Sequence, residues 1–177
     1  MNEPTHTSPV RIARQAVETF VNAGRIPSVE EVDSLDIPVP EGNRAACFVS
    51  LHRHGSLRGC IGTILPTMAS VTAEIIRNAV SACSEDPRFD PVSPEELEGL
   101  EISVDILGPP EHIIDPGELD PARYGVIVSA GFRRVLLLPD LEGVDTVTQQ
   151  LAIACRKGGI GPDEPFAMQR FTVTRYR

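Results

Sequence analysis

The chain has 177 residues and a formal net charge of −9, from 16 basic and 25 acidic residues. Apolar residues make up 41%, which is enough to build a buried core, and no run approaches the roughly 18–20 apolar residues of a membrane helix. Residues 84–120 hold twelve carboxylates and one arginine. Such a surface repels phosphate backbones, so we expect no non-specific binding of nucleic acid, although a local basic patch could still exist. Because no long apolar run is present, we also expect no membrane partner.

The acidic stretch is best interpreted as a solvated face, with an acidic docking site as the alternative. The first nine residues are polar and contain no apolar signal region. We therefore expect a cytoplasmic protein in which residues 1–177 form a single domain, with two subdomains sharing one core as a variant of that arrangement.

The first quarter of the chain predicts one helix and one strand. Ser8 and Pro9 are typical of a helix start, an apolar helical face follows, and Gly24 is typical of a helix end. Residues 25–43 contain three prolines and are expected to be mostly loop. Residues 45–52 alternate between apolar and polar side chains, which predicts a half-buried strand.

The middle of the chain predicts a turn, two helices and a second strand. The turn is expected at His54–Ser56, and the apolar periodicity predicts a helix from Thr67 to Ser84. Ser93–Glu96 has the pattern of a capping box, which indicates a short helix. Alternation over Ile102–Ile106 then predicts a strand.

The last third predicts a hairpin, a helix and a final strand. The hairpin joins residues 124–128 to residues 134–138, and a capping box opens a helix over 146–157 that Gly158 and Gly159 would end. Phe171–Tyr176 alternates as one last strand. The order of elements favours an α+β fold with mixed, largely antiparallel sheets flanked by helices.

The four cysteines do not have the spacing of a metal or redox motif. They are Cys47, Cys60, Cys83 and Cys155, and no two form a C-x-x-C pair. We expect free thiols, and we expect Cys83 and Cys155 to be small core residues because each lies on an apolar helical stripe.

The segment with the most chemical potential is residues 57–62, Leu-Arg-Gly-Cys-Ile-Gly. Gly59 and Gly62 permit close approach of a ligand or of another backbone. Arg58 beside Cys60 would favour the thiolate, which is the nucleophilic form of cysteine. We therefore predict Cys60 and Arg58 as candidate catalytic residues and the two glycines as binding residues.

Two histidines near this segment add further hypotheses. His54 could supply a base for Cys60, whereas the structural alternative has the two glycines forming a bulge or bend and Cys60 packing inward. His52 and His54 would share a strand face and could join Cys60 in a metal site, or they could be an exposed polar pair. No fourth ligand is visible, so we predict neither a metal nor a cofactor.

Asp86 and Arg88 form the second candidate binding element. Asp86 precedes a proline and favours a turn, and Arg88 is the only cation of the acidic stretch. Arg88 could pair with a neighbouring carboxylate to hold the turn, or it could bind a carboxylate or phosphate. The sequence contains no phosphate-binding loop, dinucleotide fingerprint, nucleophile elbow or zinc-protease motif.

The hexapeptide and several shorter segments resemble the AMMECR-domain family, named after a chromosomal region linked to Alport syndrome, midface hypoplasia and elliptocytosis. The matching segments occur in the expected order and reach from about Val10 to Tyr176. They are Phe48–Leu51, Leu57–Gly62, Glu85–Phe89, Pro91–Ser93, Glu101–Val104, Tyr124–Val128, Leu136–Pro139 and Lys157–Ile160.

The resemblance implies an α+β fold with a larger and a smaller subdomain and a cleft near the hexapeptide. It implies no defined activity, but it suggests Memo-like and radical-SAM proteins as partners. His52 and His54 are not part of the family pattern, and Gly158 and Asp140 depart from its commoner residues.

Two functions follow from this reading. The first is a binding or regulatory module that acts with such a partner and has no turnover of its own. The alternative is an enzyme that uses Cys60 as nucleophile, Arg58 or His54 to lower the thiol pKa, and Arg88 to orient a small anionic substrate.

Overall fold

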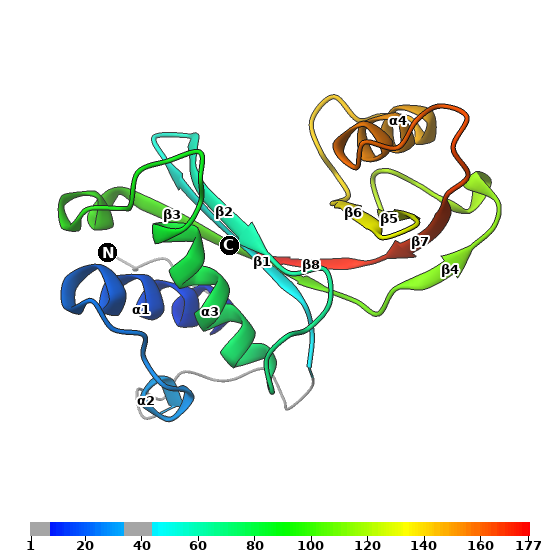
Figure 1. The fold of residues 1–177 in the computed structure, drawn as a ribbon. Helices are drawn as coiled ribbons and strands as arrows, with labels where there is room; N and C mark the ends of the chain where they lie inside the picture. Colours follow the sequence, from blue (N-terminus) through cyan, green and yellow to red (C-terminus); the bar gives the residue numbers. More distant parts are fainter. Residues whose placement is uncertain (1–7, 34–43) are drawn as a thin grey trace. The chain divides into compact units, whose positions relative to one another are not determined.

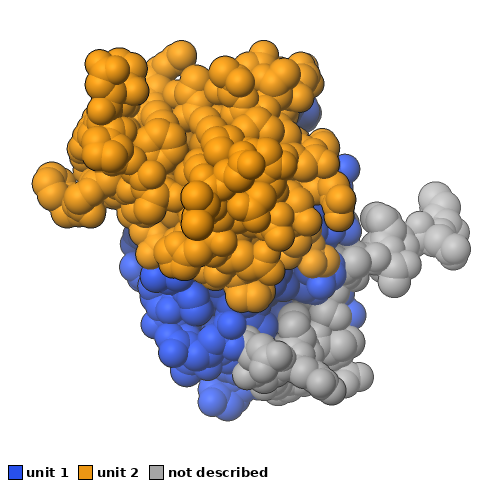
Figure 2. Space-filling view, turned by 90° about the vertical axis from the view of Figure 1, so that its right-hand side faces the viewer, with its two compact units in different colours: residues 1–106, 175–177 blue, residues 107–174 orange. Residues whose placement is uncertain are grey.

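The computed structural model describes residues 8–33 and 44–177 (Figure 1). Most of the proline-rich loop predicted after Gly24 lies outside the described residues. The chain divides into two compact units, Met1–Ile106 with Arg175–Arg177 and Leu107–Thr174, which are coloured separately in Figure 2. Each unit contains a four-stranded antiparallel sheet with helices, so the predicted α+β class is confirmed.

The first unit combines a sheet of strand order β2-β1-β3-β8 with helices on one of its faces. The strands pair without any parallel crossover, as the hairpin signals predicted. Its elements are α1 (Ser8–Ala23), α2 (Val29–Asp33), β1 (Cys47–Arg53), β2 (Ser56–Gly62), α3 (Val71–Ser84), η1 (Pro94–Gly99), β3 (Leu100–Leu107) and β8 (Val173–Tyr176).

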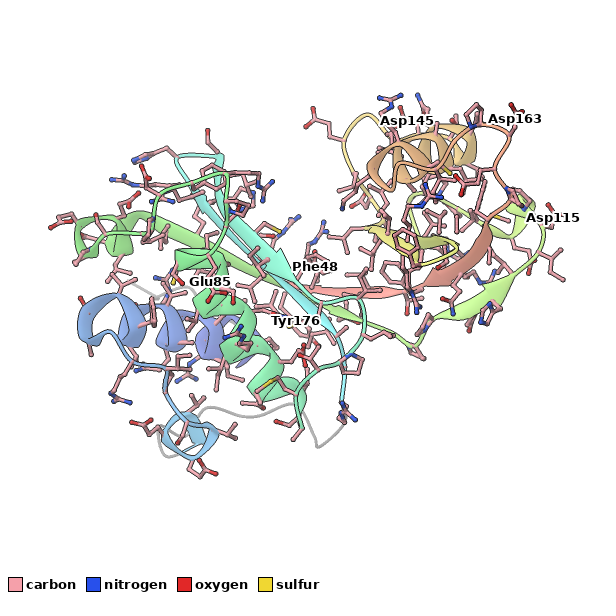
Figure 3. All side chains as sticks on the ribbon, in the orientation of Figure 1. Phe48, Glu85, Asp115, Asp145, Asp163 and Tyr176 are labelled. Atoms are coloured by element: carbon pink, nitrogen blue, oxygen red, sulfur yellow. The ribbon has the colours of Figure 1, made fainter. Side chains whose placement is uncertain are left out.

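The core of this unit lies between α1, α3 and the helix-facing side of the sheet. Cys47, Val49 and Leu51 alternate along β1 and are fully buried, as the predicted alternation requires. Ile75 of α3 is also fully buried, and Tyr176, labelled in Figure 3, packs against the same core from β8. The opposite face of the sheet is therefore the face that carries the polar residues of β1.

Two helix boundaries in this unit differ from the prediction. The helix predicted from Thr67 begins at Val71, where the Ser70 side chain accepts a hydrogen bond from the Ala73 amide. Thr67 precedes the helix because its amide and hydroxyl both donate to the buried carboxylate of Glu74. The region expected to be mostly loop also contains α2, whose short length gave little periodic signal.

The second unit is a sheet of order β4-β7-β5-β6 packed against α4. The predicted hairpin is confirmed as β5 and β6, and α4 begins at the predicted capping box, in which Thr146 and Gln149 bond to each other's backbone amides. Its elements are β4 (Glu111–Ile113), η2 (Pro116–Glu118), β5 (Gly125–Ala130), β6 (Arg133–Leu137), α4 (Val147–Lys157) and β7 (Ala167–Phe171).

Two predictions for the last third of the chain were wrong in detail. The single strand predicted over Phe171–Tyr176 is two strands, because the chain leaves one sheet at Thr172 and enters the other as β8. The Thr172 carbonyl accepts a hydrogen bond from Gly108 at this break. Cys155 is half-buried at the edge of the second core, whereas Cys83 is fully packed as predicted.

Candidate functional site

The predicted hexapeptide forms strand β2 and pairs with β1 through a tight turn. His54 and Gly55 occupy the turn with φ of 52° and 75°, a left-handed pair typical of hairpins that follow the natural strand twist. The register then shifts by one residue, because Leu51 lies opposite Gly59 while His52 lies opposite Leu57. Arg58 is therefore the extra residue of a β-bulge.

The two glycines of the hexapeptide are required by close packing. A Cβ atom on Gly59 would lie 2.2 Å from the carbonyl oxygen of Ala82, so this glycine lets α3 approach the strand. A Cβ atom on Gly62 would lie 2.3 Å from the ring of Phe48 on the other face. The predicted bulge exists, but it falls at Arg58 and neither glycine makes a bend.

Cys60 lies on the sheet face away from the helices. Its neighbours Gly59 and Ile61 face the helical core, so the thiol points to the face that Ser50 shares. The Cys60 side chain is half-buried, and its Sγ atom lies 3.3 Å from the Ser50 hydroxyl oxygen. The thiol is thus not part of the packed core beneath the helices.

Asp86 and Arg88 cover the outer edge of β2 at Cys60. The Cys60 amide donates to Asp86 Oδ2 at 2.8 Å, and Arg88 Nη2 donates to the Cys60 carbonyl at 3.4 Å. Because β2 is an edge strand, the backbone amide and carbonyl of Cys60 face away from β1 and have no partner in a neighbouring strand. We call this pair of side chains the edge clamp, since together they replace one residue of a neighbouring strand.

The edge clamp is held together by its own ion pair. Arg88 donates to Asp86 from Nε at 2.9 Å and from Nη2 at 2.7 Å, and the Arg88 guanidinium lowers the pKa of the Asp86 carboxyl well below its usual range. The Asp86 side chain is only 2% exposed, whereas that of Arg88 is 54% exposed. The Arg88 guanidinium carbon lies 5.4 Å from the centroid of the Phe89 ring, over which the side chain stacks. A fixed, accessible guanidinium therefore lies beside Cys60.

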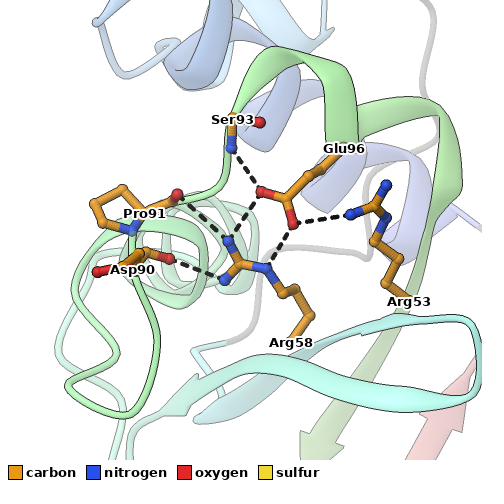
Figure 4. A network of polar contacts seen from close by, with 6 residues as sticks. All are labelled: Arg53, Arg58, Asp90, Pro91, Ser93 and Glu96. Atoms are coloured by element: carbon orange, nitrogen blue, oxygen red, sulfur yellow. Dashed lines mark hydrogen bonds and ion pairs between the residues drawn. The ribbon is translucent and has the colours of Figure 1, made fainter.

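Arg58 is engaged elsewhere, in a network with Glu96 of η1 (Figure 4). Its Nε and Nη2 atoms donate to the two Glu96 oxygens at 2.8 and 2.9 Å, and Nη1 donates to the Asp90 carbonyl at 2.9 Å. The paired arginine lowers the pKa of Glu96 to about 2. Arg53 shares Glu96 Oε1 at 3.4 Å. Arg58 thus connects β2 to η1, and no hydrogen bond joins it to the Cys60 thiol in the described part of the chain.

His52 and His54 do not form a cluster with the Cys60 thiol. Cys60 lies opposite Ser50 in β1, which ends at Arg53, so His54 lies beyond the end of that strand, and no hydrogen bond joins it to Cys60 within the described residues. His54 also lies in the turn, so it does not share a strand face with His52 as predicted. Among residues 8–33 and 44–177, no three metal-binding side chains come together.

Comparison with known proteins shows the family of the chain. The family model AMMECR1 matches residues 10–177. The chain belongs to the AMMECR1 family. It is 50% identical over 173 residues to a protein of Thermotoga maritima, covering 95% of this chain and 96% of that protein. A solved structure from Pyrococcus horikoshii, titled uncharacterized protein PH0010, has a TM-score of 0.82, 32% identity, and covers 94% of this chain and 88% of its own.

A longer relative places the same domain in a larger chain. The Clostridium acetobutylicum protein CA_C1420 is 42% identical over 168 residues, which are 95% of this AMMECR1-family chain but 35% of that relative. In the described residues of the present chain, no helix is long and apolar enough to span a bilayer.

Sequence reasoning missed two residues of this site in the AMMECR1-family chain. Ser50 is one of the polar residues in the strand predicted over residues 45–52, and Ser103 lies opposite it on β3, so that Cys60, Ser50 and Ser103 form a cross-strand row. A two-residue turn alone would have paired Ser50 with Gly59. The bulge at Arg58 places Cys60 opposite Ser50 instead, and no local sequence pattern predicts that bulge.

Proposed function

We propose that this AMMECR1-family protein is a binding module without turnover of its own, which docks on a Memo-like or radical-SAM partner through the surface around Cys60 and Arg88. One observation carries the proposal. In the described residues the Cys60 thiol contacts a single side-chain hydrogen-bonding group, the neutral hydroxyl of Ser50. A nucleophilic cysteine needs a base and an orienting group together.

The accessible part of Arg88 supplies the recognition chemistry. Asp86 engages Nε and Nη2, which fixes the guanidinium plane, and Nη1 has no hydrogen-bond partner among the described residues. A preorganised arginine loses little side-chain entropy when it binds a carboxylate or phosphate. The Clostridium acetobutylicum relative supports a modular role, because it joins this domain to a longer chain.

Binding measurements with purified proteins test the proposal. The full chain is titrated with the Memo-like and radical-SAM proteins encoded by the same genome. We expect Arg88→Ala to lower the affinity for one of them at least tenfold, which is about 1.4 kcal/mol. Arg11→Ala, an exposed arginine of α1, is the matched control and should bind as the parent does.

Arg88→Lys protects this test against misfolding. A lysine keeps a cation for the buried Asp86 carboxylate but lacks the free guanidinium nitrogen, so this variant should fold and still lose affinity. The absence of binding to both partner proteins, or equal binding by all three variants, would overturn the proposal.

The alternative function is an enzyme in which Cys60 attacks a small anionic substrate that Arg88 orients. It is favoured by the half-buried thiol beside an accessible guanidinium. Site-resolved alkylation between pH 6 and 8 separates the two functions, since an activated thiolate reacts faster than free cysteine. Cys47 and Cys83 are internal references, because burial raises their pKa values to about 12 and about 11. A Cys60 rate no higher than that of free cysteine supports the binding module.

A further inference from the structure

The edge strand β2 leaves the outer backbone groups of one residue unpaired. The Thr63 amide donates to the Cys47 carbonyl of β1 at 3.1 Å, so the backbone groups of Thr63 face β1. In an antiparallel pair, the backbone groups of successive residues face alternately toward the partner strand and away from it. Those of Gly62 therefore face outward, as those of Cys60 do. Within the described residues, no hydrogen bond joins the Gly62 amide or carbonyl to another group.

The edge clamp ends this free part of the strand on one side, because it fills the place of a neighbouring strand at Cys60. Arg88 is the nearer of its two side chains to Gly62, since Nη2 binds the Cys60 carbonyl and that carbonyl lies on the Gly62 side of the residue. Asp86 binds the Cys60 amide, which lies on the other side. A strand added beside Gly62 would therefore end at the guanidinium of Arg88.

Phe48 adds an apolar contact at the same place. It lies opposite Gly62 in β1, and a Cβ atom on Gly62 would lie 2.3 Å from the Phe48 ring. The ring, labelled in Figure 3, therefore fills the space of a side chain at position 62. Directly opposite residues of paired strands project their side chains to the same face of the sheet. A residue that paired with Gly62 from outside would place its side chain beside this ring.

We propose that β2 binds the C-terminus of a partner protein as an added antiparallel strand, with the terminal carboxylate on Arg88 and the penultimate residue paired with Gly62. Exposed sheet edges bind extended peptides in this way, through backbone hydrogen bonds. Because the edge clamp blocks the added strand at Cys60, a chain end fits this place and an internal segment does not. A carboxyl end suits the guanidinium, whereas an amino end would bring two positive charges together.

The spacing fits one terminal residue. Cys60 and Gly62 are two positions apart in β2, which is roughly 6.6 Å at the strand rise of 3.3 Å per residue. The last residue of the added strand would lie opposite Ile61, with its carboxylate directed at Arg88. The Asp86 carboxylate is only 2% exposed and is already paired with Arg88 through Nε and Nη2, which leaves Nη1 for the new carboxylate.

The recognition of a C-terminus rests on the proposed function, because both use the guanidinium of Arg88. The two remain separable. A partner protein can dock on this surface through an internal carboxylate, in which case Arg88 matters but the C-terminus of the partner does not.

Peptide titrations of the full chain test the site. The probes are acetylated hexapeptides of neutral residues with a free terminal carboxylate and varied last two positions, and each is compared with the same peptide ending in an amide. We expect apolar penultimate residues to bind best. The amide form should bind at least tenfold more weakly, because it offers no charge to Arg88. An ester in place of the penultimate backbone amide should also weaken binding, since it removes the N–H that would donate to the Gly62 carbonyl.

Nuclear magnetic resonance locates the bound peptide. The backbone amide resonance of Gly62 should shift during the titration. Arg88→Lys should bind more weakly than the parent, whereas Arg11→Ala, an exposed arginine of α1, should bind equally well.

Four results would each overturn the proposal. These are no binding at millimolar peptide, equal binding of the carboxylate and amide forms, a bound peptide that leaves the Gly62 resonance unchanged, and a Gly62 shift that grows with protein concentration alone. The last result would mean that a second copy of the chain occupies the edge.

Deletion of the last residues of a partner protein separates this proposal from the proposed function. If the shortened partner binds as before while Arg88→Ala abolishes binding, docking through Arg88 holds and recognition of a C-terminus is wrong. If the peptides bind as expected although neither partner protein binds, recognition of a C-terminus holds and the choice of partner is wrong.

Discussion

Asp86 shows how one carboxylate can both cover an edge strand and fix a neighbouring guanidinium. It accepts hydrogen bonds from the amides of Cys60 and Arg88 and from the Arg88 guanidinium. An edge strand with unpaired backbone groups invites pairing with another chain, so the edge clamp also protects β2. The same ion pair fixes the guanidinium that we propose as a recognition group.

Replacement of Asp86 by asparagine is expected to destabilise the protein. The variant loses the charge-assisted bonds to Arg88, which typically contribute about 1.5–3 kcal/mol. Urea unfolding of Asp86→Asn measures this loss. Asp90→Asn is the control, because Asp90 is exposed and contributes its backbone carbonyl to the Arg58 network. Equal stability of the two variants would show that the edge clamp does not stabilise the fold.

Gly59 is the second residue whose role is decided by packing. Gly59→Ala should lower the free energy of unfolding by about 1–3 kcal/mol, because the new methyl group meets the backbone oxygen of Ala82 and overpacks the contact. Gly99→Ala is the matched control in the same unit, where a Cβ would lie at an ordinary 3.5 Å from Arg53. Thermal unfolding of both variants checks the prediction, which fails if Gly59→Ala melts with the parent.

At the scale of elements, the link between β2 and η1 depends on a single carboxylate. The Glu96 carboxylate accepts hydrogen bonds from Arg58 and Arg53 of the hairpin. It also accepts a hydrogen bond from the Ser93 amide at the start of η1. Arg58 can reach it because the β-bulge places an extra residue in β2. A local irregularity in one strand thus fixes the position of a segment 38 residues away.

Glu96 predicts a defined dependence of stability on pH. Its pKa is about 2 in the folded chain and near 4.5 without these partners. A lowered carboxyl pKa stabilises the fold fully above the unfolded value, and this contribution is lost as the pH falls through the folded value. The contribution is on the order of 3 kcal/mol.

The comparison variant for this effect is Glu96→Gln. Its deficit in unfolding free energy relative to the parent should be largest above pH 5 and should shrink toward pH 2, as urea unfolding at each pH would show. Glu98→Gln, an exposed neighbour, should show no such trend. A deficit that stays constant across this range would contradict the assignment.

At the scale of the whole molecule, each compact unit has its own hydrophobic core. Leu51 is buried in the core of the first unit, and Leu137 is buried in that of the second. Separate cores allow separate local stabilities, which hydrogen exchange resolves.

A core truncation in each unit should therefore act mainly on that unit. Leu51→Ala and Leu137→Ala each create a cavity that costs about 2–5 kcal/mol. Hydrogen exchange measured by mass spectrometry should show the greatest loss of protection in the unit that carries the substitution. Equal loss in both units would mean that residues 1–177 unfold as one cooperative domain.

Much of the fold could be predicted because its signals are local. The strand alternation around Val49, the hairpin glycine at position 55 and the capping box at Thr146 each depend on residues within a few positions of one another. Backbone sterics and capping hydrogen bonds act over that range, so the fold class and most element boundaries followed. The boundary at Thr67 failed because Glu74, seven residues away, binds the segment that precedes the helix.

The sequence predicted which residues belong to the candidate site, but not how those residues are arranged in space. The amino-acid sequence by itself determined the α+β class and the AMMECR-domain resemblance, and it predicted Cys60, Asp86 and Arg88 as candidate residues because they lie in short segments with recognisable local patterns. The tertiary structure decided how these residues are arranged. Arg58 pairs with Glu96, His54 lies in a turn, and the Asp86 carboxylate binds the backbone amide of Cys60, 26 residues away in the chain. Contacts over such separations depend on strand register and on which face packs inward, and short-range patterns do not encode either.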